Sequence, residues 1–169
     1  MLTFEQFQTN VQEWSEARGI YEHSTALAQA LKAVSEVGEL ADATIKNDRD
    51  ELRDAIGDVA VCLVNVAYMT ESQLDYDYIF DDVNTTRRNA LQLAAGCAGS
   101  VGELSFEIAR DNRIVINLYL DAAICSLYAT AKINNLDFLD CCEAAWNEIK
   151  DRKGHTGRGT GGFGSTGDA

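Results

Sequence analysis

The stretch S-E-V-G-E-L-A-D-A-T-I-K-N-D-R-D-E-L-R-D-A-I-G-D-V-A-V-C-L, from Ser35 to Leu63, decides the fold of this chain. It predicts two helices joined by a short polar turn. Glu36 and Glu39 stand one turn apart on the first helix, and Asp54 and Asp58 one turn apart on the second. Residues at this spacing share a helix face, so an antiparallel hairpin brings four carboxylates together. Such a cluster is costly near a core unless cations neutralise it, which predicts a Mg²⁺ site that Mn²⁺ can also fill.

The composition favours a compact, mostly helical protein. The chain has 169 residues, a hydrophobic share of 46% and no proline. This length predicts one domain, or one domain built from two similar halves. The net charge is −13 and the sequence pI is about 4.4. We therefore expect no non-specific binding to nucleic acid, and an acidic protein that handles phosphates needs metal ions between itself and its ligand.

The cysteines and the N-terminus predict a soluble, cytoplasmic protein. Five cysteines lie mostly within apolar runs and form no C-x-x-C pair, so we interpret them as buried free thiols in a reducing compartment. The start, M-L-T-F-E-Q-F, lacks the basic and apolar regions of a signal peptide. No uninterrupted apolar run approaches the roughly 20 residues of a membrane span.

Apolar residues at helical spacing and polar caps place four helices in the first half. Thr3 is the predicted N-cap of the first helix, and Gly19 is predicted to end that helix. The third is apolar nearly all round from Val59 to Ala67, which is typical of the central helix of a bundle. The expected helices run over about 4–17, 25–46, 50–70 and 75–88.

The second half of the chain repeats the first. S-V-G-E-L-S-F-E-I-A-R-D from Ser100, N-L-Y-L-D-A-A-I-C-S-L from Asn117 and L-D-F-L-D-C-C-E from Leu136 mirror strings about 63 residues earlier. This spacing is too long for a common solenoid and predicts a duplicated helical unit that packs on itself. We expect an all-α bundle of about six to seven helices. Residues 1–153 form its single domain, with copy one at about 24–90, copy two at 91–153 and a flexible Gly-rich tail at 154–169.

The two copies differ at the acidic positions. Glu36 has no counterpart in the second copy, and Asp54 is replaced there by Asn117. Glu103 and Asp121 are the surviving counterparts of Glu39 and Asp58. We therefore expect one working site per chain, in the first copy.

These strings resemble the MazG-like all-α nucleotide pyrophosphohydrolases. The likeness is carried, in the family's order, by W-S-E-A-R-G at Trp14, Q-A-L-K at Gln29, S-E-V-G-E-L, D-A-I-G-D-V and W-N-E-I-K-D-R-K-G at Trp146. The family's acidic signature is E-x-x-E on one helix and E-x-x-D on the next. Ala55 stands where the second glutamate is expected, so Asp54 is the predicted substitute. Glu51 is a second candidate, about two turns from Asp58.

The resemblance has a second departure. A compact family member passes almost directly from the D-A-I-G-D-V helix to the W-N-E-I-K-D-R helix, whereas here a second copy lies between them. Copy one lacks most of the W-N-E-I-K-D-R string, and copy two lacks some of the acidic residues of the signature. This complementary loss predicts one composite site, similar to the half-degenerate arrangement of the related dimeric dUTPases.

The resemblance implies hydrolysis of a nucleoside triphosphate to the monophosphate and pyrophosphate. It implies that Glu36, Glu39, Asp54 and Asp58 hold two or three magnesium ions against the phosphates. Glu36 or Glu39 could orient or deprotonate the attacking water, and both assignments stay open.

The substrate-binding candidates are Lys32, Lys150 and Arg152 for the phosphates, and Asn10 and Trp14 for the base. Each has a structural alternative. Lys32 could instead form a salt bridge to Glu36, and Trp14 could belong to the core. Lys150 and Arg152 could simply favour a helix C-terminus.

Two other functions compete with the hydrolase. One is a helical dimerisation or regulatory module whose site has decayed, which the change to Ala55 allows. The other is a ferritin-like di-iron protein, although no histidine falls on the acidic helices.

Some compact, phage-like relatives act on purine deoxynucleotides such as dGTP, which we place ahead of dUTP and dCTP as substrates. We expect a homodimer.

Overall fold

The computed structural model describes residues 2–80 and 88–152, and within them every regular element is a helix, which confirms the all-α prediction. The helices are α1 (Phe4–Ala17), α2 (Ile20–His23), α3 (Ala26–Lys46), α4 (Arg49–Met69), α5 (Tyr76–Phe80), α6 (Ala90–Ala109), α7 (Arg113–Ile133) and α8 (Phe138–Ile149). The described elements outnumber the six to seven expected because α2 and α5 are single short turns. Of the fourth predicted helix, 75–88, residues 81–87 lie outside the described part, and so does the 154–169 tail.

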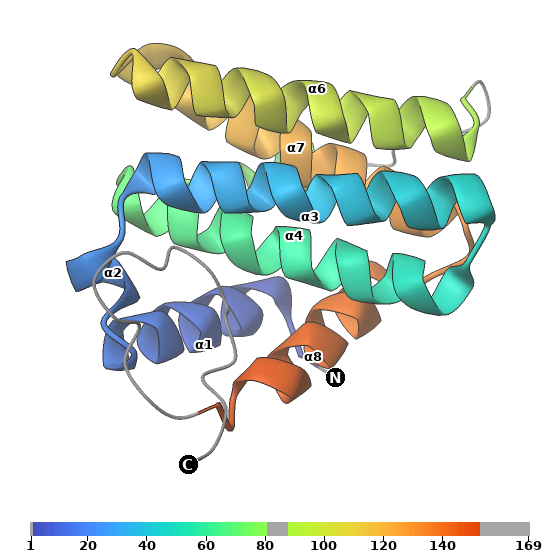
Figure 1. The fold of residues 1–169 in the computed structure, drawn as a ribbon, viewed down its shortest axis with the longest axis horizontal. Coiled ribbons are helices and arrows are strands. Elements are labelled where there is room, and N and C mark those ends of the chain that lie inside the picture. The colour runs from blue at the N-terminus through green and yellow to red at the C-terminus, as the bar shows by residue number, and fades with distance from the viewer. Residues whose placement is uncertain (1, 81–87, 153–169) are drawn as a thin grey trace.

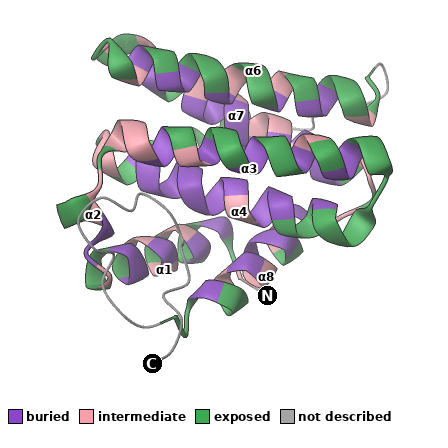
Figure 2. Cartoon of the chain, in the orientation of Figure 1, coloured by how far each residue is buried: buried purple, intermediate pink, exposed green. Residues whose placement is uncertain are grey.

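Four long helices form the centre of the molecule. α3 packs on α4 and on α6, and α7 packs on α6 and on α4 (Figure 1). α1 and α8 lie against the other side of α4. α4 is therefore surrounded, and its residues from Val59 to Ala67 are all buried, as the apolar sequence predicts (Figure 2). Its acidic first half lies at the rim of this core.

The turns of the bundle repeat with the sequence. The turn after α3 places Asn47 in the left-handed conformation, with φ 54°, and the turn after α6 does the same with Asp111, also at φ 54°. The turns after α4 and α7 place Glu71 and Asn135 there, both at φ 56°. Each helix end is closed by backbone bonds of the same pattern, as is typical of αL caps. The repetition supports a duplicated helical unit.

The last helix of each half packs on the other half. α8, from the second half, packs on α4 of the first half, while the short α5, from the first half, packs on α7 of the second. Gly57 marks the crossing of α4 and α8. A Cβ atom at this position would lie 2.5 Å from the carbonyl oxygen of Cys141 and 2.6 Å from the Cβ of Ala145. This glycine allows α8 to lie close to α4, one residue before Asp58.

Buried polar contacts fix α1 and α2 to α4. Asn65, the polar residue within the apolar stretch of α4, is fully buried. Its side-chain oxygen accepts hydrogen bonds from Ser15 Oγ at 2.7 Å and from the Tyr21 hydroxyl at 2.9 Å. Its amide group donates to Gln29 of α3 at 3.4 Å. A buried amide with these partners fixes the register of α1 against the bundle.

One helix of the described residues, α7, is long and apolar enough to cross a membrane by length and composition. Counting uninterrupted apolar residues missed it, because polar residues interrupt its sequence while its mean hydropathy stays high. This helix packs against α4, α5, α6 and α8, and 44% of its apolar window is buried inside the protein. A core helix of a bundle passes the same test, so the finding is weak support for a membrane location.

Candidate active site

An acidic pocket of about 370 Å³ opens between the C-terminal half of α3 and the N-terminal half of α4. It is lined by Glu39, Asp42, Lys46, Glu51, Asp54, Ala55 and Asp58. Three of the four predicted carboxylates, Glu39, Asp54 and Asp58, therefore face one space. Glu51, the second-line candidate, lines the same pocket. Asp42 was not predicted as a site residue, although its position three residues after Glu39 places it on the same face of the helix.

Glu36 is placed differently from the other predicted carboxylates. It is 5% exposed, is not among the residues that line the pocket, and forms an ion pair with Lys32 one turn earlier on α3. Burial alone would lower the pKa of Lys32, but the hydrogen bond and charge of Glu36 raise it overall. The salt bridge that was the structural alternative for Lys32 is thus present. The ammonium of Lys32 offsets part of the desolvation cost of this buried carboxylate.

Asp58 has the most strongly altered acidity among the predicted ligands. Burial raises the pKa of its carboxyl to about 7, and the charges of Glu36, Glu148 and Asp54 add to the rise. Arg152 acts in the opposite direction. Asp58 therefore lies where negative charges from α3, α4 and α8 meet, and this excess of negative charge favours a cation.

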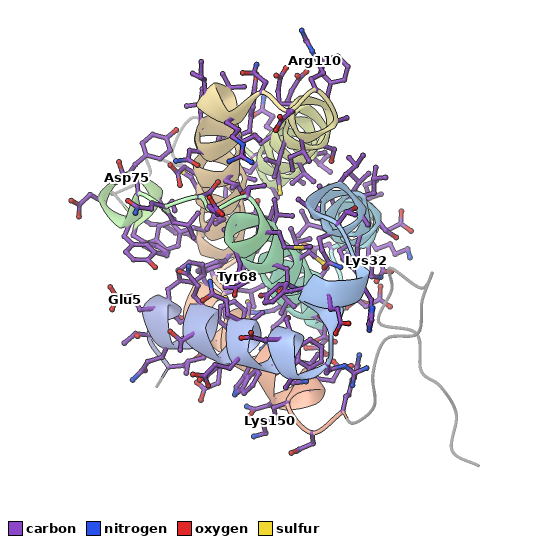
Figure 3. All side chains as sticks on the ribbon, turned by 90° about the vertical axis from the view of Figure 1, so that its left-hand side faces the viewer. Glu5, Lys32, Tyr68, Asp75, Arg110 and Lys150 are labelled. Atoms are coloured by element: carbon purple, nitrogen blue, oxygen red, sulfur yellow. The ribbon has the colours of Figure 1, made fainter. Side chains whose placement is uncertain are left out.

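The chain just after α8 brings one of the two predicted phosphate-binding residues toward Asp58. Arg152 is close enough to Asp58 to influence its pKa, and its guanidinium donates a hydrogen bond to Glu148. Lys150 instead donates to Asn147 at 2.7 Å and is exposed. Figure 3 places Lys150 at the outer end of α8, well apart from Lys32 on α3. Arg152 thus approaches the acidic residues of the first half, and Lys150 does not.

The predicted base-binding residues lie on α1. Trp14 is 7% exposed and belongs to the hydrophobic core, which was its structural alternative, and Asn10 is half-buried. The guanidinium of Arg18 lies over the Trp14 ring, 5.1 Å from its centroid. The indole is therefore already covered on one face by a cation.

The donor set of the pocket fits a hard divalent cation, because it consists of carboxylate oxygens. Within residues 2–80 and 88–152, however, no three acidic, histidine or cysteine side chains lie close enough together to hold one ion as they stand. The exposed side chains of Glu39, Glu51 and Asp54 have the freedom to turn inward. The residues thus supply the right chemistry and would have to close around an ion.

The counterpart place in the second half has become structural. Asp121, which corresponds to Asp58, is buried and accepts a hydrogen bond from the backbone amide of Asp75 at 3.2 Å. Asn117 and Glu103 are exposed.

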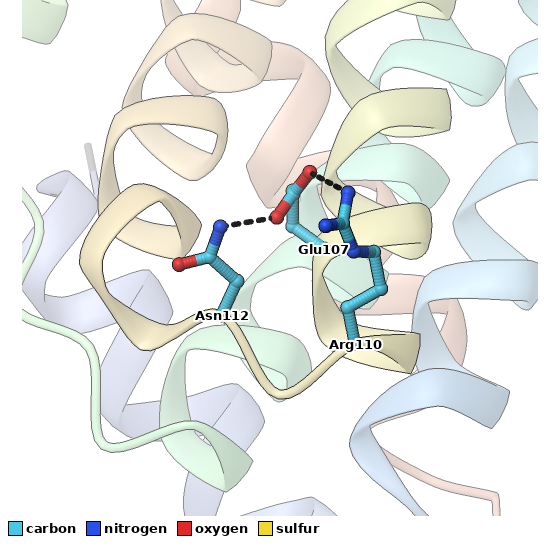
Figure 4. A network of polar contacts seen from close by, with 3 residues as sticks. All are labelled: Glu107, Arg110 and Asn112. Atoms are coloured by element: carbon cyan, nitrogen blue, oxygen red, sulfur yellow. Dashed lines mark hydrogen bonds and ion pairs between the residues drawn. The ribbon is translucent and has the colours of Figure 1, made fainter.

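The turn after α6 is also held by side chains that the first half lacks. Arg110 and Asn112 both bind Glu107 (Figure 4). Lys46, at the position that corresponds to Arg110, instead lines the acidic pocket. This difference agrees with a single acidic site in the first half.

The raised pKa of Asp58 predicts a pH effect on the metal-free protein. The folded state binds this proton up to about pH 7, whereas an unfolded aspartate releases it near pH 4. The unfolded state therefore holds fewer protons between these values, so stability falls as the pH rises from about 4 to 7 and levels off above the folded pKa. We expect the Asp58→Asn variant to lose less stability over this pH range, so that the decrease of its free energy of unfolding up to pH 8 is smaller than that of the wild type by roughly 1–3 kcal/mol. Urea unfolding with a chelator present measures this difference. An unchanged pH slope in the variant would contradict the assignment.

The comparisons with known proteins agree with the location of the pocket. Residues 24–87 match the family model of the MazG nucleotide pyrophosphohydrolase domain. Over 67 residues the chain is 37% identical to an uncharacterized 18.2 kDa protein in the rep-hol intergenic region of Haemophilus phage HP1 (strain HP1c1). The matched segment covers 40% of this chain and 41% of that protein. No solved structure matches significantly. The resemblance predicted from the sequence is confirmed for residues 24–87.

Proposed function

We propose that this chain, which carries a MazG nucleotide pyrophosphohydrolase segment at residues 24–87, hydrolyses nucleoside triphosphates to the monophosphate and pyrophosphate. The observation that carries the proposal is the pocket on that segment, lined by Glu39, Glu51, Asp54 and Asp58. In the reaction the oxygen of a water attacks the α-phosphorus. The bond from that phosphorus to the bridging oxygen breaks, and pyrophosphate leaves.

We propose that Glu39, Asp54 and Asp58, with Glu51 as a further ligand, hold divalent cations, Mg²⁺ in the cell and Mn²⁺ as a substitute. Bound cations would offset the charge that develops on the phosphate oxygens and lower the pKa of a coordinated water. Asp54 and Glu51 would together replace the carboxylate that is missing at Ala55.

The remaining roles are orientation of the water, binding of the phosphates and contact with the base. Glu39 lines the pocket, whereas Glu36 is tied to Lys32, so we propose Glu39 as the residue that orients the water. Glu36 would then hold Lys32 at the edge of the site, where the ammonium can meet a phosphate oxygen. Arg152 supplies positive charge from α8. Trp14 and Asn10 stay the proposed contacts of the base, at the far end of the nucleotide from the acids.

Pyrophosphate release from a panel of nucleoside and deoxynucleoside triphosphates tests the proposal. With Mg²⁺ present, we expect turnover of at least one substrate, and a chelator should abolish it. Purine deoxynucleotides such as dGTP are the first candidates, and dUTP or dCTP are the alternatives. A chain that hydrolyses none of them, with either Mg²⁺ or Mn²⁺, would refute the proposed reaction.

A decayed helical dimerisation or regulatory module is the second candidate function. It is favoured by Ala55, which lines the pocket in place of a carboxylate, and by the separation of the remaining acids in the described structure. Absence of turnover combined with a stable fold and a stable oligomer would support it. We also propose that the protein is a cytoplasmic homodimer that binds neither nucleic acid nor membrane, and light scattering of the purified chain tests its oligomeric state.

A further inference from the structure

A continuous apolar stripe on α3 faces solvent. Its members follow one another at alternating spacings of four and three residues, which places them along one side of a helix: Leu27, Leu31, Val34, Gly38, Ala41 and Ile45. None of the six is buried, and Leu31 is 56% and Ile45 70% exposed. The stripe contains no charged residue, although the exposed Glu39 and Asp42 lie on the same helix. This α3 stripe is an apolar surface that the described part of the chain leaves open.

α6 repeats the stripe at the corresponding positions of the second half. Counted from the correspondence of Glu103 with Glu39, these positions are Leu91, Ala95, Ala98, Gly102, Ser105 and Ala109. All except Ser105 are exposed. The helix has only two charged residues, Glu103 and Glu107, and Glu107 is buried. In a chain with a net charge of −13, an exposed helix with so few charges indicates a surface that is shielded from water.

The two stripes belong to one face of the bundle. α3 packs on α6, and together they form one layer in front of α4 and α7 (Figures 1 and 3). The two helices run in opposite directions (Figure 1). Neighbouring antiparallel helices that arose by duplication are related by an approximate two-fold axis normal to their layer. A stripe that faces outward on α3 therefore faces outward on α6 as well, and we call the combined surface the α3–α6 face.

The chemistry of the α3–α6 face suits a second copy of this chain. An interface between identical chains uses the same patch on both, and a patch with approximate two-fold symmetry is well suited to such self-pairing. Spacings of four and three residues are those of helices that pack along a common seam. An added Cβ at Gly38 or Gly102 would meet no atom within 4 Å, so these glycines leave room for the large side chains of a facing helix.

Charge also favours this partner. Two chains that each carry a net charge of −13 repel one another, and contact through a face without charged residues keeps their carboxylates apart. A basic protein would instead be attracted to the acidic surface elsewhere on the chain. Uncharged centres are also what distinguishes interfaces between proteins from the rest of their surface.

The area of the face approaches that of a stable dimer. Helices of about 20 residues are about 30 Å long, and two of them packed side by side are about 20 Å wide, which gives a projected area of about 600 Å². The relief of the side chains increases the accessible area beyond this projection. Each partner of a stable complex buries about 800 Å².

We propose that the α3–α6 face binds the same face of a second copy, so that four helices meet at the centre of a dimer. This inference rests on the homodimer proposed above and names the surface that forms it. The acidic pocket opens between α3 and α4 and lies outside the interface. Each chain of the dimer would therefore keep its own accessible site.

Sedimentation equilibrium of the full chain, measured over a range of protein concentrations, tests the assignment. We expect the wild type to be a dimer and Leu31→Glu to raise the dissociation constant of the dimer at least about 100-fold, because the two-fold symmetry brings two unpaired carboxylates into one interface. Wild-type association in Leu31→Glu would overturn the assignment. A wild type that stays monomeric, alone or on phosphatidylcholine vesicles, would overturn it too.

Leu118→Glu is the matched control. Leu118 is also a leucine within a long helix, α7 in the other layer, and it is 57% exposed. The variant adds the same charge and removes the same apolar side chain, and it should associate like the wild type. If the two variants weaken association equally, general repulsion between the chains explains both effects and the assignment is wrong. If only Leu118→Glu dissociates the dimer, the interface lies on α7.

Gly102→Leu tests the face without a change of charge. Leucine is a better helix former than glycine, and the site has room for a side chain in the single chain, so the variant should fold even if Leu31→Glu does not. We expect it to weaken the dimer roughly 10–100-fold, as overpacking of a close contact does. Unchanged association of Gly102→Leu would contradict a close approach at this helix.

Association and turnover are separate measurements on the same protein. A wild type that dimerises through the α3–α6 face but hydrolyses no triphosphate would support the interface and refute the proposed reaction. A wild type that is active as a monomer would support the reaction and refute the interface.

Discussion

Replacing Glu39 by glutamine is expected to reduce metal-dependent release of pyrophosphate by at least about 100-fold, because the loss of residues that merely orient metal ligands already costs about 10–100-fold. Glu39 lines the acidic pocket and its side chain is exposed. Glutamine keeps the size and the helix propensity of this residue while removing its charge. The fold should therefore stay intact, which circular dichroism and the melting temperature can verify.

Glu103→Gln is the control for this change. Glu103 occupies the corresponding position of the second half, on α6, and it is also exposed. Because Asp121, the counterpart of Asp58 on α7, is engaged with the backbone of Asp75, we expect this variant to keep wild-type activity. Full activity in Glu39→Gln would remove Glu39 from the site. Equal losses in the two variants would show that both halves contribute a working site.

Local sequence patterns predicted most of the fold. Thr3 caps α1 as expected, through a capping box with Gln6, and Thr25 caps α3. The buried stretch of α4 follows directly from its continuous apolar run. These features depend on hydrogen bonds and periodicities within a few residues, and such signals can be read without knowledge of the tertiary structure. The predicted composite arrangement was inferred from complementary losses between the two copies, and the packing of α8 on α4 supports it.

The features that sequence reasoning missed depend on contacts between distant segments. Glu36 and Glu39 share a helix and a signature, yet only Glu39 lines the pocket, because the rotation of α3 in the bundle turns Glu36 toward the interior. No local pattern determines that rotation. Spacing identified which residues carry the chemistry, whereas packing determines which of them meet.

The contact between α4 and α8 should be the most sensitive point of this packing. Gly57→Ala is expected to destabilise the protein by about 1–3 kcal/mol, as overpacking of a well-filled interior typically does. The added Cβ would lie 2.5 Å from the backbone oxygen of Cys141, and backbone cannot turn aside as a flexible side chain can. α8 must therefore move away from α4. Urea unfolding measures the loss of stability.

Gly38→Ala separates this effect from helix propensity. Both glycines lie inside long helices, where alanine is intrinsically better by up to about 1 kcal/mol. At Gly38 an added Cβ meets no atom within 4 Å, so this variant should be as stable as the wild type or more stable. Opposite signs for the two substitutions would show that the close approach of α8, and not the backbone freedom of glycine, requires Gly57.

The same substitution also tests whether the two halves share a site. A displaced α8 carries Arg152 away from Asp58, so Gly57→Ala should weaken pyrophosphate binding and raise the KM of the triphosphate even where the protein is fully folded. Ala145→Gly removes the second atom that the new Cβ would meet, at 2.6 Å, and in the double variant it should restore part of both losses. If Gly57→Ala lowers stability but leaves binding unchanged, α8 serves only to cover the core. In that case the first half binds its ligand without help from the second.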